Sequence, residues 1–114
     1  MVNRPESQPP LKPLTYSILL VLLEREDYGY GIAKRVARPA GGGIRLAPSN
    51  LYHVLDRLVA EGIIETSPRR DADDERRTYY RATARGREVF REETERLSTL
   101  MRAVGTLRTV PGAS

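Results

Sequence analysis

The stretch that decides the fold is residues 47–64, which read Ala47-Pro48-Ser49-Asn50-Leu51-Tyr52-His53-Val54-Leu55-Asp56-Arg57-Leu58-Val59-Ala60-Glu61-Gly62-Ile63-Ile64. Pro48 suits the first turn of a helix, because its fixed φ is already helical and its missing N–H would have no partner there. Gly62 suits the stop, where a positive φ is cheap only for glycine. The stretch therefore predicts a helix from Pro48 to Glu61, followed directly by a strand.

The predicted helix has two different faces at about 100° per residue. The apolar face, which would dock onto a core, consists of Leu51, Val54, Leu55, Leu58 and Val59. The opposite face carries Ser49, Asn50, His53, Arg57 and Ala60. Polar side chains near the N-terminal end are typical of a recognition helix that reads base edges in the major groove. An ordinary amphipathic surface helix has a similar pattern. The neighbouring segments are therefore needed to distinguish a recognition helix from a surface helix.

Length and composition restrict the classes of protein. The chain has 114 residues, of which 39% are hydrophobic, and this suits one small domain with a modest core. It has no cysteine and a single histidine, which argues against disulfides, metal centres and a nucleophile–base pair. The net charge of +4 suits an anionic partner. We therefore expect a protein that is not an enzyme and that holds no metal or other cofactor.

The chain shows no sign of a targeting or membrane segment. Residues 1–10 are polar and proline-rich, unlike a signal peptide, and the longest apolar run, residues 18–23, is too short to span a bilayer. We expect a cytoplasmic, nucleoid-associated protein with no membrane partner. Residues 1–12 are expected to be a flexible arm, which either follows a phosphate backbone through Arg4 and Lys12 or is simply a disordered tail.

Two helices are expected before the quoted stretch. Residues 14–24 are apolar around most of a helical circumference, so this helix must be buried by more than one partner. After the turn signal at residues 28–31, a short amphipathic helix is expected at residues 30–38, with Ile32 and Val36 inside. Its outer face would carry three cations, Lys34, Arg35 and Arg38. These cations either anchor a DNA backbone or form a solvated surface.

A glycine-rich segment at residues 39–43 ends this helix. Ile44-Arg45-Leu46 then alternates apolar and polar residues, which predicts a minimal strand leading into the quoted helix. The three glycines do not form a phosphate loop, because no lysine followed by serine or threonine comes after them. A nucleotide site is therefore not expected here.

A β-hairpin is expected after Gly62, with strands at residues 63–66 and 78–83. Its long loop holds two arginine pairs, Arg69, Arg70, Arg76 and Arg77. The tip holds the acidic residues Asp71, Asp73, Asp74 and Glu75. Facing arginines repel one another unless negative charge lies between them, and either these carboxylates or DNA phosphates can supply it. The loop lacks the glycine turn and final glutamate of an EF-hand, so we do not expect it to bind calcium.

The last helix is expected to begin after Thr83, whose hydroxyl suits an N-cap, and to run to about Leu107. Its apolar residues recur in heptads: Phe90, Leu97 and Val104 form one series and Leu100 and Leu107 another, widened by Val89 and Met101. Such a repeat indicates either a dimerisation seam or a helix lying back on its own core. We favour the dimer, because the apolar first helix needs cover that so small a domain lacks.

The expected order is helix, helix, strand, helix, strand, charged loop, strand and long helix. This is the order of a winged helix-turn-helix, in which the third helix enters the major groove and the hairpin wing lies along the neighbouring backbone. The sequence therefore predicts a mainly α (α+β) fold, a winged helix-turn-helix DNA-binding domain at residues 13–83 with a long C-terminal dimerisation helix at residues 84–107. Residues 108–114 are expected to be a disordered tail.

Motifs in this order resemble the PadR-type transcriptional regulators over roughly residues 14–90. They are Tyr28-Gly29-Tyr30-Gly31, Pro48-Ser49-Asn50-Leu51-Tyr52, Leu58-Val59-Ala60-Glu61-Gly62-Ile63-Ile64 and Arg77-Thr78-Tyr79-Tyr80-Arg81-Ala82-Thr83-Ala84-Arg85-Gly86. The resemblance implies a homodimeric bacterial repressor on an inverted-repeat operator in double-stranded DNA, whose last helix contacts the partner subunit. It also implies that a small apolar or aromatic effector can act on the dimer.

Two positions depart from the family pattern. Ala47 stands where such proteins often have a capping serine, so the start of the quoted helix lacks a side-chain acceptor. The wing tip is acidic, which would confine phosphate contacts to the arginines at its base.

The expected site residues fall into three groups. Base edges would be read by Ser49, Asn50, His53 and Arg57. The DNA backbone would be contacted by Lys34, Arg35, Tyr52, Arg69, Arg70, Arg76 and Arg77. A dimer seam, or an effector pocket within it, would be formed by Tyr16, Phe90, Leu97, Leu100, Met101, Val104 and Leu107. Core packing is the competing interpretation for Tyr52, and a plain interface core for the third group.

A second class of function remains open. A winged helix can bind protein in place of DNA, because a fold does not determine a function. Such a module would bind every duplex only at the non-specific level, with dissociation constants around 10⁻⁴–10⁻⁶ M at physiological salt.

Overall fold

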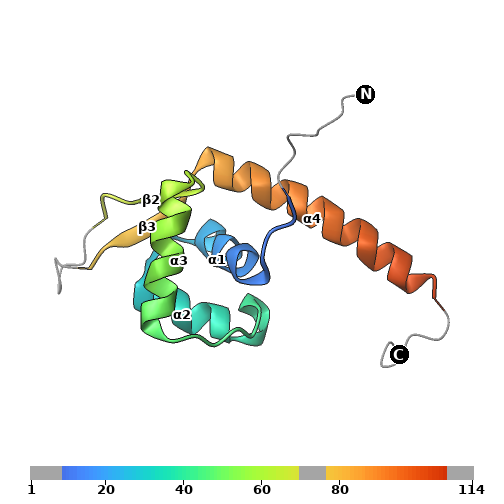
Figure 1. The fold of residues 1–114 in the computed structure, drawn as a ribbon, viewed down its shortest axis with the longest axis horizontal. Coiled ribbons are helices and arrows are strands. Elements are labelled where there is room, and N and C mark those ends of the chain that lie inside the picture. Colours follow the sequence, from blue (N-terminus) through green and yellow to red (C-terminus); the bar gives the residue numbers. More distant parts are fainter. Residues whose placement is uncertain (1–8, 70–76, 108–114) are drawn as a thin grey trace.

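The computed structural model describes residues 9–69 and 77–107 (Figure 1). Its elements are α1 (Pro13–Glu24), β1 (Asp27–Tyr28), α2 (Gly29–Ala37), the short 3₁₀ helix η1 (Pro39–Gly41), α3 (Pro48–Ala60), β2 (Ile64–Thr66), β3 (Tyr79–Ala82) and α4 (Ala84–Gly105). The predictions made for residues 1–8, for the wing tip at residues 70–76 and for the tail at residues 108–114 lie outside the described residues. The mainly α fold with a small antiparallel sheet is confirmed.

Helix α1 is the centre of the domain. It lies among α2, α3 and α4 in Figure 1 and contacts α2, α4 and β3, as its nearly all-round apolar character requires. The buried core that forms around it consists of Ile18, Leu19, Val21, Leu22, Ile32, Val36, Leu51, Leu55, Leu58, Ile63, Ile64, Tyr80, Ala82 and Val89. Each helix and both hairpin strands therefore contribute to one continuous core.

The sheet has the strand order β1-β3-β2, and both pairs are antiparallel. The hairpin of β2 and β3 was predicted correctly, but the expected strand at residues 44–46 is wrong. The N–H of Ile44 donates to the carbonyl of Val36 at 2.9 Å, so this segment folds back on the end of α2. The third strand is β1, where Tyr28 pairs with Tyr79.

Helix α3 begins and ends as the sequence predicts. Pro48 opens it, and Ala47 makes no side-chain cap. At its end Gly62 has φ +79°, its N–H donates to the carbonyl of Val59 at 3.0 Å, and the next N–H, of Ile63, donates to that of Leu58 at 3.1 Å. This is a Schellman stop, and it aims the chain directly into β2.

Helix α4 is capped by Thr83, whose hydroxyl oxygen accepts from the N–H of Gly86 at 3.0 Å. Its first half lies on α1, where the Tyr16 and Phe90 rings stack with centroids 4.5 Å apart. The Tyr16 hydroxyl shares a 2.6 Å hydrogen bond with that of Thr94. Its second half projects beyond the rest of the domain (Figure 1).

Candidate nucleic-acid interface

The exposed face of α3 offers polar groups that nothing in the described chain occupies. Leu51, Leu55 and Leu58 are at most 1% exposed and fix the rotation of the helix about its axis. Ser49, Asn50 and His53 are exposed on other sides of the helix, and none has a hydrogen bond or ion pair within residues 9–69 and 77–107. Val59, expected on the docking face, is instead 37% exposed. The N-terminal half of α3 is thus free to present donors and acceptors to a ligand.

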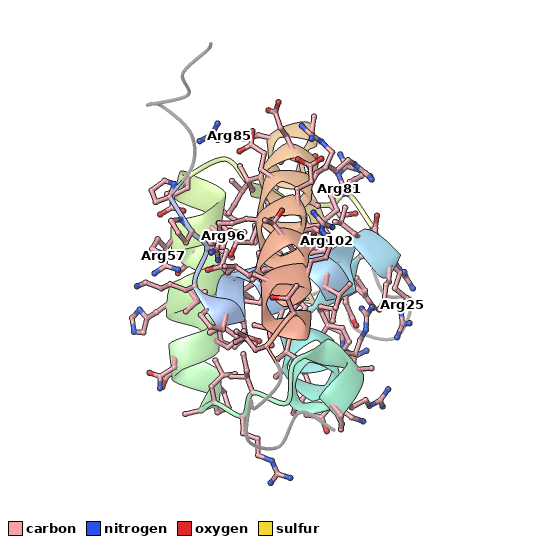
Figure 2. The ribbon with its side chains drawn as sticks, turned by 90° about the vertical axis from the view of Figure 1, so that its right-hand side faces the viewer. Arg25, Arg57, Arg81, Arg85, Arg96 and Arg102 are labelled. Carbon is pink, nitrogen blue, oxygen red and sulfur yellow. The ribbon has the colours of Figure 1, made fainter. Side chains whose placement is uncertain are left out.

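Arg57 is held differently from the other three base-reading candidates. Its Nε lies 3.7 Å from a carboxylate oxygen of Glu61, one turn further along α3. Its Nη2 donates weakly to the hydroxyl of Thr15 in α1, at 3.5 Å. Figure 2 shows Arg57 on the α3 side of the molecule and Arg25 on the opposite side. Arg57 therefore has to leave two intramolecular contacts before it can reach a base.

The prediction that Arg35 lies on the outer face of α2 is wrong. Its side chain is only 7% exposed. One end of the guanidinium, Nη2, donates to the carbonyl of Val21 at 2.6 Å and to a carboxylate oxygen of Glu24 at 2.9 Å. The other end, Nη1, donates to Asp27 at 3.2 Å and to the carbonyl of Arg25 at 3.4 Å. Arg35 therefore serves the fold and is removed from the DNA-backbone candidates.

The physical reason is the position of Arg35 at the edge of the apolar face of α2. It adjoins Val36, which is fully buried, and it comes close to the C-terminal end of α1. Carbonyls at a helix end have no partner within the helix, and a cation is favoured there. A guanidinium can satisfy several such acceptors at once.

The remaining cations around α2 lie at the surface. Lys34 is exposed on α2, Arg38 is exposed just after α2, and Arg25 is exposed just after α1. The ammonium of Lys34 lies 5.4 Å from the centre of the Tyr30 ring. Together these groups form an exposed basic edge that can approach an anion.

Each described wing arginine lies over a tyrosine ring. The guanidinium carbon of Arg69 is 4.6 Å from the centre of the Tyr79 ring, and that of Arg77 is 4.4 Å from the centre of the Tyr28 ring. The two rings in turn pack together, with centroids 5.5 Å apart. This stack fixes the base of the wing beside α2. Arg70 and Arg76, with the acidic wing tip, lie outside the described residues.

The sequence allows Tyr52 to contact the DNA backbone or to pack in the core, and the structure shows features of both. It is 48% exposed, so it is not a core residue, yet its ring lies against the backbone of Gly29. A methyl group built on Gly29 would come within 2.6 Å of the Tyr52 hydroxyl oxygen. Glycine at this position therefore allows α3 to place an aromatic ring on the first residue of α2.

A hollow of about 500 Å³ opens next to Tyr52, and we call it the tyrosine notch. It is lined by Tyr28, Gly29, Tyr30, Tyr52, Arg77, Thr78 and Tyr80. Burial raises the pKa of Tyr80 above its ordinary value, and the negative charge of Asp56 and the neighbouring Tyr52 raise it further. The notch thus joins the start of α2, the side of α3 and the wing into one surface.

The C-terminal half of α4 presents an apolar face to solvent. Leu100 is 47% exposed, Met101 65% and Val104 38%, and Leu107, two residues beyond the end of α4, is 60% exposed. Leu97 is partly buried, as are Tyr16 and Phe90 of the stacked pair. The seven residues predicted for the seam therefore divide into a half-buried group on α1 and an exposed group beyond it.

Residues 9–69 and 77–107 contain no cluster of three His, Cys, Asp or Glu side chains arranged to hold a metal ion. The same residues include no helix that is both long and apolar enough to cross a membrane.

Comparison with known proteins identifies the family. Residues 18–92 match the transcriptional regulator PadR-like family. The chain belongs to this PadR-like family. It is 35% identical over 81 residues to the transcriptional regulator Rv3488 of Mycobacterium tuberculosis, which covers 71% of this chain and 72% of that protein.

Solved structures of PadR-like and related regulators share the fold. A transcriptional regulator from Clostridium thermocellum superposes with a TM-score of 0.67 at 25% identity, covering 84% of this chain and 90% of that one. PadR of Bacillus subtilis, solved in complex with operator DNA, superposes with a TM-score of 0.62 at 23% identity, covering 93% of this chain and 54% of the other. The PadR-like chain thus has the winged-helix architecture that its motifs predict.

Sequence reasoning missed the role of three tyrosines that line the notch of this PadR-like chain. The sequence places Tyr28 in a turn, Tyr30 at the junction of that turn with the second helix, and Tyr80 in a strand. The signal that could have found them is the alternation of tyrosine and glycine at residues 28–31, because a glycine beside an aromatic residue allows another ring to approach the backbone. The position of Tyr80 depends on the pairing of β3 with β1, which no local pattern predicts.

Proposed function

We propose that this PadR-like regulator binds DNA sequence-specifically and acts as a repressor, as a homodimer on an inverted-repeat operator. The observation that carries the proposal is the exposed N-terminal half of α3, where Ser49, Asn50 and His53 have no partner within residues 9–69 and 77–107. Hydroxyl, amide and imidazole groups at that end of a helix suit the readout of base edges in the major groove.

Affinity that does not depend on sequence would come from the cations around α3. Lys34 lies on the exposed edge of α2, and Arg69 and Arg77 lie at the base of the wing. Each phosphate that such a cation neutralises releases counterions, so binding weakens as salt rises. The likeness in fold to PadR of Bacillus subtilis, whose structure holds operator DNA, supports this assignment.

The dimer would form through the projecting half of α4. Leu100, Met101 and Val104 of α4, and Leu107 just beyond its end, follow a heptad-like spacing and are all more than a third exposed. An apolar stripe of this kind on a helix that leaves its own domain favours pairing with a second copy. Two copies would place two α3 helices about 34 Å apart, one turn of the duplex.

An effector would act at the centre of the dimer, in an apolar slot between α1 and α4. The Tyr16 and Phe90 rings stack on each other at that point. An apolar or aromatic molecule entering there has to displace one ring and take its place in the stack. Such a displacement would move α4 relative to α1 and thereby change the spacing of the two α3 helices.

The test is a selection of bound fragments from random duplex DNA with the full chain. Enrichment of an inverted repeat with half-sites one helical turn apart is the expected result. Recovery of no sequence, with binding to every duplex at the non-specific level, would favour a winged helix that binds protein. Repression is then measured with a reporter whose promoter carries the recovered repeat.

A further inference from the structure

The tyrosine notch offers two kinds of donor that the contacts proposed above do not use, the Tyr80 hydroxyl and the first backbone N–H groups of α2. Its walls come from three elements that are distant in the sequence: Gly29 opens α2, Tyr52 lies on α3 and Tyr80 lies on β3. The hollow measures about 500 Å³, which is ample for a tetrahedral anion. A space bounded by the recognition helix and the wing lies where a DNA strand bordering the major groove would pass.

Tyr80 supplies the evidence that the notch receives a ligand. It is only 7% exposed, yet its hydroxyl makes no hydrogen bond within residues 9–69 and 77–107. In the same residues no fully buried side-chain polar atom lacks a partner, so this hydroxyl must reach the hollow that the residue lines. A buried side chain whose one polar atom is left open calls for an acceptor from outside the chain.

The other groups around the notch favour a negatively charged acceptor. The first turn of α2 carries no acidic side chain, and its N–H groups give that end of the helix a partial positive charge. The guanidinium of Arg77 is held over the Tyr28 ring on the wing side. Two carboxylates oppose an anion here. Asp56 on α3 lies near enough to raise the pKa of Tyr80. Asp27, which is paired with Arg35, lies against Gly31 in the first turn of α2 and accepts from the backbone N–H of Tyr28.

Building on the DNA-binding function proposed above, we propose that the tyrosine notch seats one backbone phosphate of the duplex in each half-site. The Tyr80 hydroxyl and the first turn of α2 donate to its non-bridging oxygens, and Arg77 flanks it. The notch is built from rigid elements, so a phosphate seated there fixes the depth and register of α3 in the groove. Tyr80 thus acts as a positioning residue that reads no base.

The first experiment compares Tyr80→Phe with Tyr79→Phe in duplex binding. Each variant loses one oxygen, but Tyr79 does not line the notch. Tyr80→Phe is expected to weaken binding about tenfold, on an operator and on a non-specific duplex alike, because a hydrogen bond to a charged group is lost. The slope of log affinity against log salt should stay unchanged, whereas Arg77→Gln should lower it by about one. Full affinity in Tyr80→Phe would overturn the proposal.

The second experiment locates the phosphate. Each phosphate of the recovered half-site is replaced in turn by a neutral methylphosphonate, and the loss is measured for the wild type and for Tyr80→Phe. The proposal expects one position at which the two losses are not additive. Additive losses at every position would mean that Tyr80 acts only through the fold. If an operator is recovered and the losses are additive, the phosphate-binding role of the notch is rejected and the proposed DNA-binding function is retained.

Two further variants change the notch without removing Tyr80. Gly29→Ala adds a methyl group within 2.6 Å of the Tyr52 hydroxyl oxygen, so it should displace that ring and weaken binding while keeping the melting temperature. Asp56→Asn removes one of the two opposing charges, the one that is not paired with Arg35, and should strengthen binding severalfold. Free inorganic phosphate could occupy the same notch. If phosphate raises the melting temperature of the wild type but not of Tyr80→Phe, and both proteins bind the duplex equally, the notch binds the free anion and not the DNA backbone.

Discussion

The Arg35 guanidinium joins the end of α1, β1 and α2 around a single buried positive charge. Its four acceptors are two backbone carbonyls and two carboxylates, and one of these carboxylates, that of Asp27, is itself nearly buried. A buried ion pair contributes little when compared with a well-packed apolar pair, but removing one partner strands the other. The fold thus requires the positive charge of Arg35, because the buried Asp27 carboxylate and the C-terminal carbonyls of α1 would otherwise lose this partner.

We expect Arg35→Met to lower the free energy of unfolding by about 3–5 kcal/mol, because Asp27 would lose its buried counter-charge. Urea denaturation followed by circular dichroism measures the loss. Lys34→Met, one residue earlier and exposed, is the matched control and should change stability by less than about 0.5 kcal/mol. Equal stabilities for the two variants would contradict the role given to Arg35.

His53 and Arg57 are both exposed on α3, but they differ in whether they already contact other residues of the chain. His53 has no partner within the described residues, whereas Arg57 contacts Glu61 and Thr15. We expect His53→Ala to reduce the preference for the operator over a non-specific duplex by about 1–3 kcal/mol. Arg57→Ala should cost less, because the arginine must give up its own contacts before it reads a base. Competition titrations with both duplexes measure the two effects, and a larger loss for Arg57→Ala would reverse this assignment.

Among the helices, α4 holds a nearly buried carboxylate, that of Glu93, which pairs with Arg96 of the same helix. Glu93 is 6% exposed and accepts from Arg96 through both oxygens, at 3.0 and 2.6 Å. The hydrogen bond from Arg96 lowers the pKa of Glu93 below its ordinary value, and the backbone N–H of Leu11 lowers it as well, against the opposing effect of burial. The Glu93 carboxylate thus lies close to the backbone of Leu11, just before α1, and is held mainly by Arg96.

The sign of the pH dependence follows from this lowered pKa. A carboxyl whose folded pKa lies below its unfolded pKa, about 4.3, adds stability above that pH and loses it as pH falls through the folded pKa. We expect Glu93→Gln to lower the melting temperature at pH 7 and to lessen its fall between about pH 5 and 3. Glu88→Gln, exposed on the same helix, should reproduce the wild-type profile. Identical acid profiles for the wild type and Glu93→Gln would contradict this account.

The elements that sequence predicts well are those whose ends are set by local chemistry. Pro48, Gly62 and Thr83 each act on the backbone within a few residues, so α3 and the start of α4 could be placed to within about one residue. Strand β1 could not, because two residues acquire strand geometry only by pairing with β3, some fifty positions away. The prediction that Arg35 lies on the outer face of α2 was wrong for the same reason, because its acceptor, the carbonyl of Val21, lies on another helix. The tyrosine notch likewise depends on contacts among α2, α3 and β3.

In the whole molecule, the projection of α4 separates the surface proposed for dimerisation from the surface proposed for DNA binding. Its first half packs on α1, and its second half carries Leu100, Met101 and Val104 away from the core, with Leu107 just beyond its end. Exposed apolar side chains of this kind add nothing to the stability of the isolated domain, so a charge placed among them should leave its fold intact. That separation makes the proposed dimer testable without disturbing α3.

We expect Met101→Glu to raise the dissociation constant of the dimer at least tenfold, because pairing two helices would bury two like charges in the seam. Sedimentation equilibrium measures the change, and the melting temperature of the diluted protein should stay the same. Thr99→Glu is the matched control, because its side chain points about 160° away around α4. Affinity for the inverted repeat should fall with dimerisation in Met101→Glu, while affinity for a single half-site persists, since each half-site contacts one α3 and one wing. A Met101→Glu protein that stays dimeric would place the seam on another face of the molecule.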